Sequence, residues 1–282
     1  MEINKRQQLD DRGDDGLFGP ASVTWRLHAD PMLWLGGVRA LYLQALHPEA
    51  MAGIERHSRF RDDPWGRLRR TGDYVGTVTY GTREQAERAG ARVRTVHRRL
   101  GLDDPDLLRW VHCCEVDSFL VAVRRAGMAV SAAEADRYVA EQVRAAVLAG
   151  VPEPGTPTSV AELAAYFGTL RPGLALTPAA RSAARFLLFP PMPVRVELLT
   201  PARPLWTVLA SASFGLLPRW ARRMYAAAAL PAADLPGANL APVDWAATAT
   251  ARTLRSAVRL LPAGLREGPH YQAAKARVAA RG

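Results

Sequence analysis

The sequence "REQAERAGARVRTVHRRLGLDDPDLLRWVHCCEVDSFLVAVRRAG" (residues 83–127) decides the fold class. In its first part the apolar residues recur at steps of three and four, with arginine and glutamate between them: Ala86, Ala89, Val93, Val96 and Leu100. This spacing predicts an amphipathic helix over 83–100. Gly101 then stops that helix, and Asp104 followed by Pro105 is typical of the start of a second helix, over about 105–126.

Helical patterns continue on both sides of this stretch. Residues 31–46 predict a buried helix, because their apolar run is interrupted by Arg39 and Gln44 and is shorter than the roughly 20 residues that span a bilayer. Ser131 and Glu134 form a capping-box pattern before a helix that ends at Gly150. After a Pro-rich connector, more helical patterns follow over 158–170, 176–189 and 190–228. With no strand-length alternation and no repeat, the chain is predicted to be all-α, a single multi-helix domain.

The ends of the chain differ from its middle. Residues 1–15 are expected to be a flexible lead-in, 16–245 the helical domain, and 246–282 an Arg-rich helix and tail. The polar N-terminus has no apolar core of a signal peptide. Cys113 and Cys114 are adjacent, which is unfavourable for a disulfide and unlike metal-binding C-x-x-C spacing. Both features indicate a reducing, cytoplasmic compartment.

The net charge of +10 does not indicate a nucleic-acid surface, because the basic residues are spread along the whole chain. Arginine accounts for 35 of the 37 basic residues, which resembles a coding bias. The segment "LLPRWARRMYAAAAL" (216–230) interleaves arginines with leucine and aromatic residues. It favours a packed surface helix with snorkelling arginines over the alternative, a peripheral membrane contact.

The stretch "DPWGRLRRTGDYVGTVTYGT" (63–82) carries the candidate site. On a helix Arg67, Arg70 and Thr71 stand at i, i+3 and i+4 and share a face, while Arg69 points elsewhere. Guanidinium and hydroxyl donors on one stripe suit a bound oxygen species or a propionate, and the bulky residues that follow suit a pocket wall. The alternative is a solvated arginine face.

None of the six histidines has the spacing of a zinc signature, although a single axial ligand to a cofactor needs no such spacing. His97 and His112 lie on apolar helix faces, where a histidine is either a core residue or a ligand, and His47 precedes Pro48 at a helix end. Glu115 and Asp117 fall on different helix faces, which argues against a paired acid–base role. Asp117 is instead expected to face a neighbouring helix or solvent. The chain also lacks a G-x-S-x-G elbow and a phosphate-binding glycine loop.

Residues 16–82, together with "ARVRTVHRRL" (91–100) and "DDPDLLRWVHCCEVDSFL" (103–120), closely resemble the family that includes MpaB-type oxygenases and, more distantly, the rubber oxygenase called latex clearing protein. The likeness covers about residues 16–230. It implies an all-helical fold with a distantly globin-like core that holds haem b and uses dioxygen.

The resemblance also implies roles for individual residues. The distal Arg-x-x-Lys-Thr motif of the rubber oxygenase corresponds to Arg67, Arg70 and Thr71, with arginine in place of the lysine, and a guanidinium does not ligate iron. The axial histidine of a Val-Arg-x-x-His helix corresponds to His97, with His112 and His47 as rivals. The expected function is a haem-dependent oxygenase that acts on a small apolar or natural-product substrate with dioxygen or peroxide. The alternative is a non-catalytic helical protein that binds haem or a lipid-like ligand.

Overall fold

The computed structural model describes residues 14–57, 62–229 and 241–280. In its central region the helices begin and end at the capping residues that the sequence predicts. Helix α6 (Arg83–Leu100) begins with a capping box between Thr82 and Gln85 and ends at the left-handed Gly101. Helix α7 (Pro105–Arg125) is capped by the Asp104 side chain. Helix α8 (Ala132–Ala149) begins with the predicted Ser131 capping box and ends at Gly150. Local capping chemistry therefore sets the boundaries of this central region.

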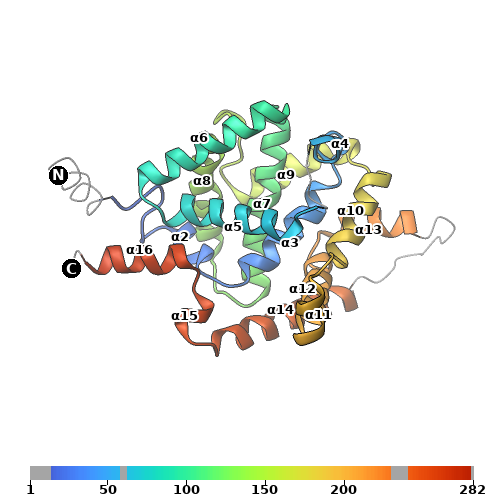
Figure 1. Cartoon of the computed structure of the whole chain (residues 1–282). Helices are drawn as coiled ribbons and strands as arrows, with labels where there is room; N and C mark the ends of the chain where they lie inside the picture. The colour runs from blue at the N-terminus through green and yellow to red at the C-terminus, as the bar shows by residue number, and fades with distance from the viewer. Residues whose placement is uncertain (1–13, 58–61, 230–240, 281–282) are drawn as a thin grey trace.

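The other helices complete an all-α architecture, with no strand among the described residues, as predicted (Figure 1). They are α2 (Val23–His28), α3 (Leu33–Gln44), α4 (Pro48–His57), α5 (Pro64–Tyr80), α9 (Val160–Leu170), the 3-10 helix η1 (Arg171–Gly173), α10 (Pro178–Leu188), α11 (Val194–Leu199), α12 (Ala202–Gly215), α13 (Arg219–Ala229), α14 (Ala241–Arg259), α15 (Ala263–Arg266) and α16 (Pro269–Ala279). Helix α14 crosses the expected boundary at residue 245, and most of the expected lead-in lies outside the described residues. Within the described part, no helix is long and apolar enough to cross a membrane.

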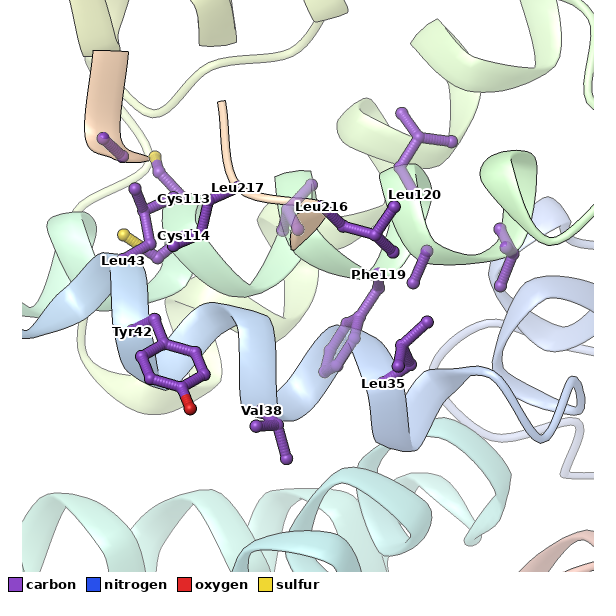
Figure 2. Packing of buried hydrophobic residues seen from close by; sticks show 14 of the residues in the cluster. Leu35, Val38, Tyr42, Leu43, Cys113, Cys114, Phe119, Leu120, Leu216 and Leu217 are labelled. Atoms are coloured by element: carbon purple, nitrogen blue, oxygen red, sulfur yellow. The ribbon is translucent and has the colours of Figure 1, made fainter. Parts of the chain in front are cut away.

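The centre of the core is the contact between α3 and α7 (Figure 2). Its buried apolar side chains include Leu35, Val38, Tyr42, Leu43, Cys113, Cys114, Phe119 and Leu120. The two helices approach closely at Gly36, where an added Cβ would lie 2.9 Å from the Phe119 ring and 2.9 Å from the Ser118 carbonyl oxygen. Both cysteines are free thiols, and burial raises the pKa of Cys113 to about 12.

A buried arginine joins α3 to α7 and to the end of α12. Arg39 is 2% exposed and donates hydrogen bonds to Asp117 Oδ2 (2.7 Å), Ser118 Oγ (2.6 Å) and the Leu216 carbonyl (2.9 Å). The expectation that Asp117 faces a neighbouring helix is thereby confirmed. A buried charge is tolerated because several partners satisfy it at once.

Helix α5 packs on α6, α16 and α2, whereas its contact with α3 is slight. The ring of Tyr271 on the C-terminal helix α16 contacts Tyr80 of α5 (ring centroids 5.1 Å apart) and Trp25 of α2 (6.3 Å). Arg277 also donates to the Tyr80 carbonyl at 2.7 Å. Helix α5 therefore lies beside the α3–α7 core without packing tightly on it, and a space remains between α5 and these two helices.

Candidate functional site

Two adjoining cavities lie beneath α5, between it and α3, α7 and α12. Their volumes are about 150 Å³ and about 510 Å³, the larger within the size range of small-molecule sites. Both have the same residues in part of their walls: Gly37, Trp65, Leu68, Thr71, Phe119 and Trp206. The shared wall makes them two compartments of one mainly apolar space.

Helix α5 carries the predicted polar stripe of Arg67, Arg70 and Thr71. Only Arg67 and Thr71 face a cavity, and Arg70 does not. Arg67, Leu68 and Thr71 line the smaller cavity, and burial together with the charge of Arg70 lowers the pKa of Arg67. Arg70 is 63% exposed and donates to Asp63 Oδ2 at 3.0 Å, outside both cavity walls. Leu68 lines both cavities. Arg70 lies two residues later, about 200° around the helix, and so points to the opposite side. Arg69 lines the larger cavity.

Glu115 of α7 places a carboxyl group in the wall of the smaller cavity. Gln44 of α3 lines the same cavity. Burial raises the pKa of Glu115 to about 7, and a hydrogen bond with the Gln44 side chain opposes part of that rise. Glu115 is not among the residues predicted from the sequence to form the site. Its spacing of four from Phe119, which lines the same cavity, was the available signal.

The three candidate axial histidines are outside the walls of these two cavities. His97 keeps its Nδ1 buried with no hydrogen-bond partner among the described residues, and burial lowers its pKa, partly opposed by Asp103. Burial also lowers the pKa of His112, to about 4. The Nδ1 of His47 accepts from the Ala50 amide at 3.4 Å, and its ring lies 5.7 Å from Trp110. Burial lowers the pKa of His47 too, partly opposed by Glu49 and Asp104, so burial favours the neutral form of all three imidazoles.

Two histidines that sequence reasoning left aside do line the larger cavity. His28 is buried, with its ring nitrogens hydrogen-bonded to Thr79 Oγ1 (2.9 Å) and Tyr138 Oη (3.1 Å). His270 reaches the cavity from α16 and lies 3.6 Å from Asp73. Both ring nitrogens of His28 are thus hydrogen-bonded. His270 reaches the cavity only because α16 packs on α5, a long-range contact that no local sequence pattern predicts.

Two features that a haem site needs are present, but they are in different places, because His97 lies outside the walls of both cavities. Iron in haem takes a neutral imidazole, and His97 has a buried ring nitrogen without a partner. The space beneath α5 supplies an apolar lining with a guanidinium from Arg67 and a hydroxyl from Thr71. No group of three or more His, Cys, Asp or Glu side chains that could hold a bare metal ion is found in the described part of the chain.

Comparison with known protein families finds a match over most of the chain. The family model described as "ER-bound oxygenase mpaB/B'/Rubber oxygenase, catalytic domain" matches residues 25–256. That range includes the walls of both cavities except for the part contributed by α16 and the residues just before it. No curated protein and no solved structure matches the chain.

Proposed function

Because the chain belongs to the family of mpaB and rubber oxygenase catalytic domains, we propose that it is a haem b-dependent oxygenase whose substrate is a small apolar molecule. The observation that carries this proposal is the apolar space beneath α5 with Arg67, Thr71 and Glu115 in its wall. Haem, when bound, supplies the activation of dioxygen or peroxide.

In this proposal His97 holds the iron, with His112 and His47 as rivals. The buried, unpartnered Nδ1 of His97 and its lowered pKa favour it, because a ligand must be neutral. His47 already has a polar partner in the Ala50 amide.

Arg67 and Thr71 are proposed to donate hydrogen bonds to an oxygen species or a carboxylate in the cavity. A guanidinium stays charged and offers fixed donors, and in a mainly apolar space such donors act more strongly than in water. Arg70 is given no role at the reacting atoms, because it pairs with Asp63 on the outside of α5. Its contribution is to hold the N-terminal turn of α5, on which Arg67 stands.

A second candidate function is binding of an apolar ligand without catalysis. It is favoured by one observation, that none of the three candidate histidines lines the two cavities. In that case the cavities would retain a ligand and show no oxygen-dependent turnover.

The test is the absorption spectrum of the protein purified after haem-supplemented expression, with a pyridine haemochromogen assay. We expect one haem b per chain, lost in His97→Ala and kept in His112→Ala and His47→Ala, with circular dichroism showing that each variant is folded. Arg67→Ala is expected to keep haem and to lose turnover. Absence of haem from every preparation, or full retention in His97→Ala, would contradict the assignment.

A further inference from the structure

The segment between α10 and α12 exposes an unusual amount of apolar surface. No residue of α11 is buried, and Val194, Leu198 and Leu199 are 69%, 77% and 80% exposed. Phe189 before α11 and Leu205 after it are 59% and 57% exposed. We call these five residues the apolar face. Single exposed apolar residues are normal, but a group of them close together in the chain is a candidate interaction surface.

Along the chain, the residues before and after the apolar face are strongly one-sided in charge, although Arg219 and Arg222 pair with Asp244. Residues 163–229 contain eight arginines and a single acidic residue, Glu197, and that carboxylate is already paired with Arg203. Arg181, Arg185 and Arg195 are exposed on α10 and α11. Apolar side chains with arginines nearby are complementary to the surface of a lipid bilayer, in which anionic headgroups cover an apolar interior.

The segment that carries the apolar face also forms part of the site. Phe186, Leu187 and Pro190 line the smaller cavity, immediately before α11. The Trp65 indole of α5 donates to the Pro191 carbonyl at 2.8 Å. One wall of the cavity is therefore continuous in sequence with the exposed apolar face.

Helix α13 is packed, as the sequence favoured over the alternative of a membrane contact. Arg222 is 3% exposed and donates to Asp244 Oδ1 at 2.6 Å, and Tyr225 donates to the Tyr42 carbonyl at 2.7 Å. Trp220 packs against the core. The favoured interpretation of 216–230, a packed surface helix, thus agrees with the structure of α13. Exposed large apolar side chains lie on α11, and others lie on and after α14, where Trp245, Leu260 and Leu265 are 75%, 86% and 75% exposed.

We propose that the apolar face binds the surface of an anionic lipid membrane, with Leu198 and Leu199 inserted among the lipids and Arg181, Arg185 and Arg195 at the headgroups. A second copy of the chain fits less well, because two such faces would bring like charges together. Apolar molecules dissolve in membranes, so this docking would place the wall of the smaller cavity beside a store of apolar ligand. The proposal needs neither haem nor turnover and stands or falls separately from the proposed function.

The test is co-sedimentation of the full chain with vesicles of phosphatidylcholine alone or with about one third phosphatidylserine. We expect binding to the anionic vesicles that weakens with salt, and at least about a tenfold loss of partitioning in Leu198→Glu/Leu199→Glu. Val96→Glu on α6, at a side chain that is 50% exposed, is the matched control and should bind as the unsubstituted chain does. Arg185→Glu/Arg195→Glu, which leaves the leucines in place, should also reduce binding to anionic vesicles.

Three outcomes would overturn the proposal. The first is no binding to either kind of vesicle. The second is equal loss in the leucine variant and in the Val96→Glu control. The third is a dimer, seen by light scattering without lipid, that Leu198→Glu/Leu199→Glu dissociates, because the face would then be an interface between copies.

Discussion

The closest approach of α3 and α7 is predicted to make Gly36 intolerant of a single methyl group, while its neighbour Gly37 accepts one. In Gly36→Ala the new Cβ would lie 2.9 Å from Phe119 Cδ1, 2.9 Å from the Ser118 carbonyl oxygen and 3.0 Å from Phe119 Cα, so the backbone of α7 must move. Overpacking of this kind costs about 1–3 kcal/mol, and the better helix propensity of alanine returns about 1 kcal/mol. In Gly37→Ala the nearest atom is Phe119 Cε1 at 4.0 Å, an ordinary contact.

The assay is urea unfolding followed by circular dichroism, with thermal melts alongside. We expect the free energy of unfolding to fall by up to about 2 kcal/mol in Gly36→Ala and to rise by up to about 1 kcal/mol in Gly37→Ala. For a chain of this size these changes correspond to melting temperatures up to about 3 °C lower and up to about 2 °C higher. Gly37 lines both cavities, so Gly37→Ala should also weaken ligand binding without destabilising the fold. Equal stability of the two variants, or a loss confined to Gly37→Ala, would refute this account of the helix contact.

Two further predictions concern buried charge. Because the folded protein raises the pKa of Glu115 from 4.5 to about 7, folding favours its protonated form, and stability should fall as the pH rises between those values. Glu115→Gln should remove this part of the pH dependence, measured as melting temperature from about pH 5 to 8; an unchanged slope would show that Glu115 is not its source. Arg39→Met should cost about 2–4 kcal/mol by chemical unfolding, somewhat less than a fully buried pair because Asp117 is 27% exposed. Arg26→Met, which breaks the exposed pair with Glu134, should cost less than about 1 kcal/mol, and similar losses in the two variants would contradict the ranking.

The helices could be predicted because their signals are local. Asp104, Ser131, Gly101 and Gly150 act within one helical turn, and each ends or begins a helix where the sequence indicates. What the sequence could not provide was the packing of α3 against α7 at Gly36, because that depends on residues about 80 positions apart.

The candidate site was only partly predictable for the same reason. Helical spacing placed Arg67 and Thr71 together, and both line the smaller cavity. The same spacing grouped Arg70 with them, but the direction of a cavity is set by the helices opposite, and Asp63 competes for this guanidinium. Glu115 and His270 become part of the cavity walls only through tertiary contacts.

Helix α16 makes the two cavities separable. Arg277 donates to the carbonyl of Tyr80, 197 residues earlier, and Tyr271 lines the larger cavity. No residue of α16 lines the smaller cavity. Removal of α16 would therefore take away part of the wall of the larger cavity and leave the lining of the smaller one complete.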